Sequence, residues 1–211
     1  MKKLFIEARR KISLNKEKLS ELARNLPDTI YIAYSIQYKT LALEARKYIE
    51  SCKNKKLAGF SQILGCSQIK TQAEAILLIG EARFHALNLA KSSGKQVVIF
   101  DGYSISNISK QEILELQKKD KGKYIKFLAA EKIGILVSGK SGQENLKQAE
   151  TLKQEIKKKN KQAYLFLTDN INLAELENFQ MEIFVNTACP GLALDSGKII
   201  NYNSIKTKNG K

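Results

Sequence analysis

The sequence MEIFVNTACPGLALD, residues 181–195, joins a run of β-forming residues to a cysteine that is followed by proline. Residues 181–185 are typical of a strand, and proline cannot continue a sheet ladder because it has no backbone N–H to donate. The Cys189 thiol is therefore predicted to lie where a buried strand ends, which in an open parallel sheet is where ligands bind. An isolated cysteine is more often a small buried hydrophobic residue, so both interpretations stay open on the residues alone.

The rest of the sequence alternates between short apolar runs and longer amphipathic stretches. The apolar runs are typical of buried strands and the stretches between them of crossover helices, a pattern that favours parallel pairing. We therefore expect an α/β fold with two similar small domains, each a mainly parallel sheet flanked by helices. The predicted strands are residues 29–36, 57–66 (or an extended loop), 75–80, 96–100, 133–137, 163–167, 183–185 and 199–202, and the predicted helices are 16–24, 38–52, 81–92, 144–159 and 173–179.

The expected boundary between the two domains falls near residue 108. Residues 1–108 form the first α/β unit, which carries Cys66, and residues 109–205 form the second, which carries Cys189. A long, interrupted helical connection is expected over residues 108–130. Residues 206–211 are expected to form a disordered tail.

Composition excludes several classes of protein. The chain has 211 residues, 43% hydrophobic and 27% charged, which is ordinary for a globular protein with a real core. No apolar run reaches the about 18 residues that span a bilayer, and the N-terminal sequence becomes charged before any signal-like core develops. Cys52, Cys66 and Cys189 are odd in number and widely spaced, which indicates reduced thiols and a cytoplasmic protein. Cys52, at the end of a predicted helix, is interpreted as structural or incidental.

A net charge of +15 has two interpretations. A basic α/β protein can associate with RNA or with a ribosomal partner, in which case its affinity would fall steeply with salt. Alternatively, the lysines coat solvated helix faces. The second interpretation is favoured because the lysine runs, such as residues 157–161, contain no interleaved aromatics on which bases could stack, and the sequence has no glycine-rich phosphate loop. No membrane partner and no direct nucleic-acid binding are expected.

Four motifs, in order along the chain, resemble those of one enzyme family. They are QILGC at residues 62–66, IGEARFH at 79–85, VSGKSGQ at 137–143, and residues 169–179 followed by FVNTACPGLALD at 184–195. Together they resemble the diphthamide-synthesis radical S-adenosylmethionine enzymes, the 2-(3-amino-3-carboxypropyl)histidine synthases. The resemblance covers nearly the whole chain, but only the second and third domains of the family.

The resemblance implies a metal-dependent transferase. In the family, three cysteines from three similar domains hold a 4Fe–4S cluster whose open iron binds S-adenosylmethionine. The reduced cluster breaks the bond between sulfur and the methionine Cγ, which gives a 3-amino-3-carboxypropyl radical and methylthioadenosine. The radical adds to a histidine of translation elongation factor 2, in the first step of diphthamide biosynthesis. Two widely spaced cysteines would not by themselves predict a cluster, since clusters usually use four thiolates.

The motif positions imply roles for seven residues. Cys66 and Cys189 would ligate iron. Arg83 would pair with an anionic group, or else form a surface salt bridge, and His85 would orient groups or shuttle protons, or else be a packed residue of the first helical turn. Three residues are expected near S-adenosylmethionine, namely Ser138, Gly142 and Gln143. They belong to a polar loop after a strand, and such a loop offers N–H groups and a side-chain amide to a carboxylate.

Two departures from the family pattern affect the expected function. The cysteine of the family's first domain has no counterpart, so we expect a split enzyme in which a separate polypeptide supplies that domain and the third cluster cysteine, with an electron donor as a further partner. Gly191 also replaces the arginine that typically follows Cys-Pro, and Ser196 replaces the second of an acidic pair. The alternatives are a non-catalytic subunit of the same complex and a basic RNA-associated protein.

Overall fold

The computed structural model describes residues 7–12, 14–140, 142–194 and 196–209. The chain forms two compact units, Met1–Ile113 and Leu114–Lys211. Each unit contains a mainly parallel sheet flanked by helices, which confirms the expected fold class. No helix in the described part of the chain is long and apolar enough to cross a membrane.

The first unit is built on a five-stranded sheet of order β2-β1-β3-β4-β5. Its strands are β1 (Thr29–Tyr34), β2 (Lys56–Gln62), β3 (Ala75–Ile79), β4 (Gln96–Phe100) and β5 (Ile105–Asn107). The first four pair in parallel, whereas β5 is an antiparallel edge strand. The sequence did not predict β5, which is three residues long and follows a turn in which Asp101 accepts hydrogen bonds from the N–H groups of Tyr103 and Ser104.

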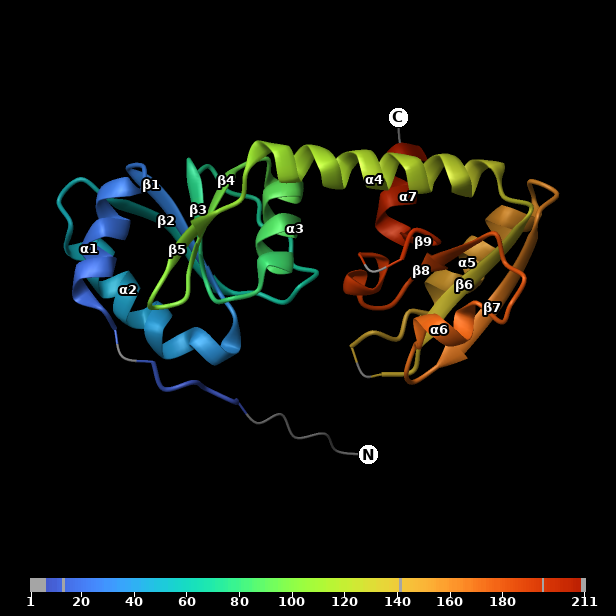
Figure 1. Ribbon diagram of the computed structural model, residues 1–211, viewed down its shortest axis with the longest axis horizontal. Helices are drawn as coiled ribbons and strands as arrows, with labels where there is room; N and C mark the ends of the chain where they lie inside the picture. The colour runs from blue at the N-terminus through green and yellow to red at the C-terminus, as the bar shows by residue number, and fades with distance from the viewer. Residues whose placement is uncertain (1–6, 13, 141, 195, 210–211) are drawn as a thin grey trace. The chain divides into compact units, whose positions relative to one another are not determined.

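Helices cover both faces of the first sheet (Figure 1). The helices α1 (Lys16–Asn25) and α2 (Lys39–Ser51), with the 3₁₀ turn η1 (Ile36–Tyr38), pack against one face, and α3 (Arg83–Ser93) packs against the other. The central strand β3 is buried at every position, as expected for a parallel strand covered on both sides. This arrangement places the loops that follow β1 to β4 at one edge of the sheet.

The predicted connection is a single helix, α4 (Lys110–Ala129), without an interruption. The expected interruption is absent: a side chain at Gly122 would face open space, so nothing disturbs the helix there. Phe127 is the buried residue of α4, whereas Leu114, Ile125 and Leu128 are exposed.

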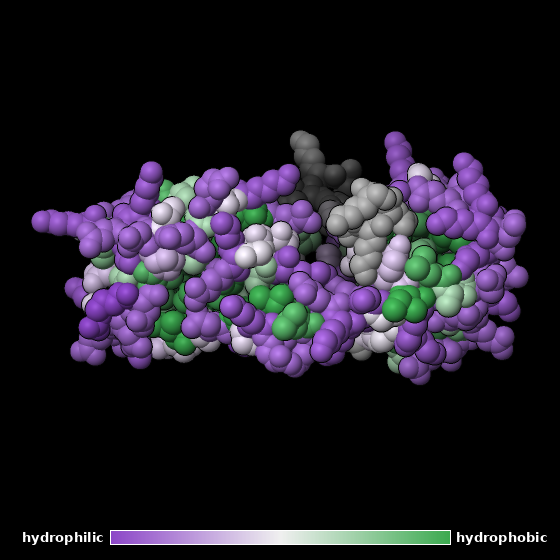
Figure 2. Space-filling model, turned by 90° about the horizontal axis from the view of Figure 1, so that it is seen from above, coloured by the Kyte–Doolittle hydropathy of each residue, from purple (hydrophilic) through white to green (hydrophobic). Residues whose placement is uncertain are grey.

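The face seen in Figure 2 is mostly hydrophilic and carries small, separate apolar patches.

The second unit is built on a four-stranded, wholly parallel sheet of order β7-β6-β8-β9. Its strands are β6 (Lys132–Ser138), β7 (Gln162–Thr168), β8 (Ile183–Asn186) and β9 (Ile199–Asn201). One face packs against α4, α5 (Leu146–Lys157) and α7 (Tyr202–Asn209), and the other packs against α6 (Leu173–Leu176) and the 3₁₀ turn η2 (Pro190–Ala193).

The C-terminal residues are helical where a disordered tail was expected. Helix α7 extends to Asn209, and Ile205 is buried in the same hydrophobic cluster as Ile133 and Val185. Burial of this apolar side chain holds the helix start against the sheet. Residues 210 and 211 of the expected tail lie outside the described residues.

Candidate functional site

Each sheet carries one of the two motif cysteines in a loop that follows a parallel strand. Cys66 follows β2 and is exposed, and Cys189 follows β8 and is half-buried; both are free thiols. Because all strands next to β2 and β8 are parallel to them, each cysteine lies at the carboxyl edge of its sheet. This is the edge at which open α/β sheets bind ligands.

The turn before Cys66 rests on the first turns of α3. A Cβ atom at Gly65 would lie 2.8 Å from Cε1 of Phe84 and 3.1 Å from Nε2 of His85, so only glycine allows this approach. The Nδ2 of Asn88 donates a hydrogen bond of 3.0 Å to the Gly65 carbonyl. Motif residues of α3 therefore support the backbone next to the thiol.

His85 forms part of the support under the Cys66 loop. Burial lowers the pKa of its imidazole, so the ring is favoured in its neutral form. Its Nδ1 is buried, and no hydrogen-bond partner for it occurs among the residues that the structure describes. The geometry is that of a packed first-turn residue, and a role in proton transfer stays a prediction.

Arg83 forms a surface ion pair. Its Nε lies 2.9 Å from Oε1 of Glu112, and its Nη2 lies 3.5 Å from the Asn107 carbonyl. Glu112 also accepts hydrogen bonds of 2.9 and 2.8 Å from the N–H and hydroxyl of Ser109, which forms a capping box at the start of α4. The guanidinium is thus occupied by Glu112, as in the competing interpretation of the sequence, and its pairing with an anionic ligand stays a prediction.

The pKa of Glu112 is lowered to about 2, chiefly by the Ser109 N–H, then by the Ser109 hydroxyl and by Arg83. A carboxyl whose pKa is lower in the folded chain contributes stability above its unfolded pKa, and loses it as pH falls toward 2. We expect Glu112→Gln to flatten the loss of stability between about pH 4.5 and pH 2, as measured by the urea midpoint at several pH values. Arg83→Gln should keep most of that dependence, since Ser109 remains. A Glu112→Gln profile equal to wild type would contradict this assignment.

A second polar cluster lies at the carboxyl edge of the first sheet. Glu81, in the GEARFH motif, forms an ion pair with Arg10, whose Nη1 also lies 2.7 Å from Oη of Tyr38. Hydrogen bonds from Tyr38 and Arg10 lower the pKa of Glu81, and burial, the largest cause, raises the pKa of Tyr38 to about 12. Glu81 therefore stays ionised and is held by its partners.

In the second unit, the loop after β6 folds into a compact turn. The Oγ of buried Ser138 accepts a hydrogen bond of 3.2 Å from the N–H of Lys140, and the carbonyl of Lys140 accepts one of 3.0 Å from the N–H of Gln143. Gly142 has a φ of 80°, a left-handed conformation that favours glycine. Ser141 lies outside the described residues.

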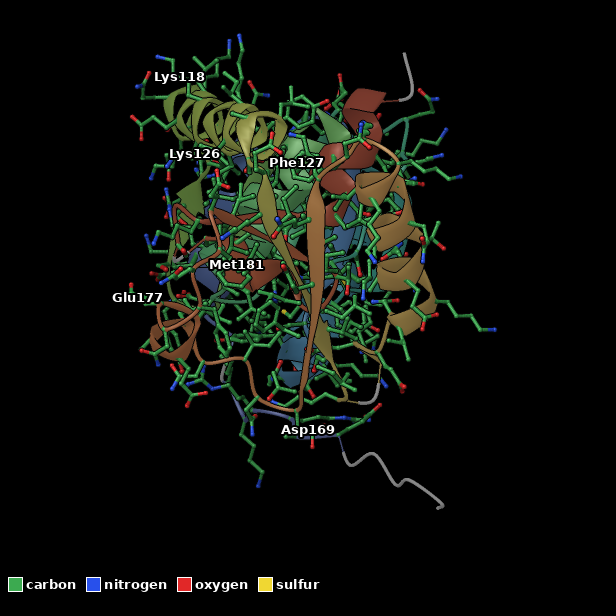
Figure 3. All side chains as sticks on the ribbon, turned by 90° about the vertical axis from the view of Figure 1, so that its right-hand side faces the viewer. Lys118, Lys126, Phe127, Asp169, Glu177 and Met181 are labelled. Carbon is green, nitrogen blue, oxygen red and sulfur yellow. The ribbon has the colours of Figure 1, made fainter. Side chains whose placement is uncertain are left out.

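Asp169 contacts this loop from the end of the neighbouring strand β7. A Cβ atom at Gly139 would lie 2.3 Å from Oδ1 of Asp169, and the Gly139 N–H donates to the Thr168 carbonyl. Figure 3 shows Asp169 at the end of the sheet opposite Phe127. The carboxylate therefore lies at the same edge as Ser138, and its position after a strand was the signal in the sequence that could have identified it.

The Cys189 turn is held by buried polar residues that the sequence analysis did not single out as site residues. Asn186 and Thr187, only 2% and 4% exposed, are the last residue of β8 and the residue after it. Nδ2 of Asn186 donates to the Cys189 carbonyl at 2.8 Å, and Asn201 donates to the Pro190 carbonyl at 3.1 Å. Their position at strand ends beside a Cys-Pro pair is the signal that could have found them.

The residues present fit an iron–sulfur cluster in kind but not in number. Cys66 and Cys189 are free thiols in loops at sheet edges, and thiolates are the usual ligands of such clusters. Within residues 7–12, 14–140, 142–194 and 196–209, no group of three or more His, Cys, Asp or Glu side chains could hold a metal ion. Of its three free thiols, the chain therefore offers the two motif cysteines, one in each unit, as candidate ligands of the right chemistry.

Comparison with known sequences identifies the family. Residues 1–202 match the family described as "Putative diphthamide synthesis protein". The chain is 30% identical over 207 residues to a 2-(3-amino-3-carboxypropyl)histidine synthase of Pyrococcus horikoshii, covering 91% of this chain and 59% of the relative. It is 28% identical over 170 residues to the synthase of Methanocaldococcus jannaschii, covering 79% and 46%. The chain thus spans about half the length of these relatives.

Solved structures agree with this assignment. The crystal structure of Dph2 from Pyrococcus horikoshii matches with a TM-score of 0.79 and 29% identity, over 91% of this chain and 60% of that one. The structure of the same protein with a 4Fe–4S cluster matches equally well, over 92% and 60%. The family match and the structural match both confirm the resemblance that the four motifs indicated. The chain belongs to the diphthamide-synthesis family.

Proposed function

We propose that this chain is the C-terminal part, or a subunit, of a split 2-(3-amino-3-carboxypropyl)histidine synthase. It would transfer the 3-amino-3-carboxypropyl group from S-adenosylmethionine to a histidine of translation elongation factor 2. The observation that carries this proposal is the pair of free thiols, Cys66 and Cys189, each in a loop at the carboxyl edge of its own parallel sheet. The relatives that share this fold are named as the synthase.

Cys66 and Cys189 would ligate iron of a 4Fe–4S cluster, which supplies the electron that cleaves S-adenosylmethionine when it is bound. The protein's own contribution would be to hold both thiols on supported turns. The compact loop with Ser138, Gly142 and Gln143 would bind the cosubstrate through its N–H groups and side-chain amide. These roles follow from motif position and from the carboxyl-edge placement.

A third cysteine from a polypeptide outside these 211 residues would complete the cluster. Two thiolates are fewer than a three-cysteine site needs, and Cys52 is a poor candidate for the third ligand. Its Sγ lies 3.4 Å from the Tyr48 carbonyl, beyond the end of α2 and outside the motif loops. A separate electron donor would reduce the cluster.

We expect this chain, reconstituted anaerobically by itself with iron and sulfide, to hold a 4Fe–4S cluster at well below full occupancy. Two protein thiolates leave two irons without protein ligands, so the cluster is easily lost. Iron and sulfide analysis with visible absorption would measure occupancy, before and after addition of the polypeptide that carries the missing cysteine. A cluster at full occupancy in the chain alone would refute the split-enzyme proposal.

One observation favours a second candidate, a non-catalytic subunit of the same assembly. Gly191 lies in η2, directly after Cys189-Pro190, where the family typically carries arginine. The chain thus lacks a fixed bidentate donor beside the proposed cluster. Such a subunit would dock the elongation factor or support reduction of a cluster held elsewhere.

A further inference from the structure

Side-chain amides of three asparagines, Asn145, Asn186 and Asn201, hold the backbone around Cys189; we call them the asparagine clamp. Nδ2 of Asn186 donates to the Cys189 carbonyl and to Oδ1 of Asn201, both at 2.8 Å, and its Oδ1 accepts the Ala188 N–H at 3.0 Å. Nδ2 of Asn201 donates to the Pro190 carbonyl at 3.1 Å. Two of the three asparagines thus extend from the paired strand ends of β8 and β9.

Asn145 reaches the same turn from a different element. Its Nδ2 donates to the Thr187 carbonyl at 2.7 Å, and it lies 3.4 Å from the Gln143 carbonyl at the end of the loop after β6. Thr187 is fixed on its other side, because its N–H and hydroxyl donate to the Leu136 carbonyl at 3.1 and 2.8 Å. The cysteine turn is therefore tied to β6 and to the loop that follows β6.

The position of Asn145 makes this contact unusual. Asn145 is the N-cap residue of α5, where an asparagine side chain normally accepts a hydrogen bond from the first helical N–H groups. Here the side chain makes no capping hydrogen bond. By contrast, Asn15 and Asn172, the N-cap residues of α1 and α6, both cap their helices through Oδ1. The Asn145 amide is thus directed at the cysteine turn although a helix terminus lies beside it.

We propose that Asn145 is a positioning residue that couples Gln143, at the end of the loop after β6, to the Cys189 turn. A displacement of Gln143 moves Asn145 and breaks its hydrogen bond to the Thr187 carbonyl, which removes one of the hydrogen bonds that hold the backbone beside the thiol. The use of this coupling, to set the thiol when a cosubstrate binds, rests on the proposed function, whereas the coupling itself rests on the hydrogen bonds described.

Asn145→Asp separates positioning from mere structural support. The carboxylate keeps the shape of the side chain but replaces the N–H donor by an acceptor that repels the Thr187 carbonyl. Aspartate is also a preferred N-cap residue, so the stability of α5 should stay equal or rise. We expect amide hydrogen exchange in residues 187–194 to be about three- to ten-fold faster, the effect of one lost hydrogen bond, with an unchanged or higher urea midpoint.

The measurement uses the full-length chain without metal, so it does not depend on the proposed enzyme activity. Iodoacetamide labelling, followed by peptide mass spectrometry, should show the same selective increase at Cys189, with Cys52 and Cys66 as internal controls. Asn172→Asp is the matched variant, since its cap does not touch the cysteine turn, and it should leave both rates unchanged. Asn145→Ala removes no cap and should reproduce the faster exchange if the aspartate variant folds poorly.

Two results would overturn the proposal. Wild-type exchange in residues 187–194 of both Asn145 variants would show that the amide does not hold the turn. Faster exchange throughout the second unit, together with a lower urea midpoint, would show that Asn145 is only a general structural support. Neither result depends on methylthioadenosine formation, so the coupling can be tested even if the proposed enzymatic function is wrong.

Discussion

Replacing either Cys66 or Cys189 by alanine is expected to abolish methylthioadenosine formation in the complex assembled with the proposed polypeptide that would supply the third cysteine. Each substitution removes one of the two proposed thiolate ligands, and neither loop offers a second cysteine that could replace it. A cluster held by two protein ligands in place of three is lost or misplaced, so no product forms. The measurement is anaerobic reconstitution, reduction, and chromatography of the nucleoside product.

Cys52→Ala is the matched control for this experiment. Cys52 is half-buried beyond the end of α2, outside every motif, and its replacement should leave product formation at the wild-type level. If Cys66→Ala and Cys189→Ala also turn over normally, the chain is not a catalytic cluster-binding subunit. The non-catalytic candidate, favoured by Gly191, would then be the better account.

Phe184→Ala is expected to destabilise the second unit by about 3–5 kcal/mol, the usual cost of removing a buried aromatic side chain. Phe184 is 2% exposed and packs edge-on against Phe166, with ring centroids 5.5 Å apart. Its ring also fills the space above Gly134, where a Cβ atom would lie 2.3 Å from Cδ1. Because Phe184 precedes Asn186 in β8, its loss should also loosen the Cys189 turn. Urea unfolding followed by circular dichroism measures the change.

Phe179→Ala provides the comparison. Phe179 packs against the same Phe166 ring, at 4.7 Å, but its side chain is 47% exposed. Removing the Phe179 side chain therefore loses less buried apolar surface than removing that of Phe184, so we expect Phe179→Ala to destabilise the second unit by about 1 kcal/mol. Equal costs for Phe179→Ala and Phe184→Ala would show that the face of the sheet under α6 is not a packed core.

The fold class was predictable because strands that are buried on both faces contain mostly apolar residues, which can be recognised in a short stretch of sequence. Fully buried parallel strands read as continuous apolar runs, as in AILLI at β3, and every position of that strand is buried. Strand β5 was missed because a three-residue edge strand has no such run, and its pairing depends on a turn at Asp101. The uninterrupted α4 was also missed, since an exposed helix tolerates Gly122 at a cost that other positions offset.

The sequence alone determined the family, the two mainly parallel sheets and the placement of Cys189 after a strand, because motifs and apolar runs are local. It placed Cys66 at the end of a strand or extended loop over residues 57–66, whereas β2 ends at Gln62 and Cys66 lies in the turn that follows. Only tertiary structure showed what holds those thiols: Phe84 and His85 under Gly65, and the asparagine clamp around Cys189. Asn145 and Thr187 are 42 positions apart, and their hydrogen bond exists because β6 and β8 pair side by side. Amide contacts of this kind leave no periodic pattern in a sequence, because an asparagine side chain can equally cap a helix, stabilise a turn or hydrogen-bond a distant backbone group.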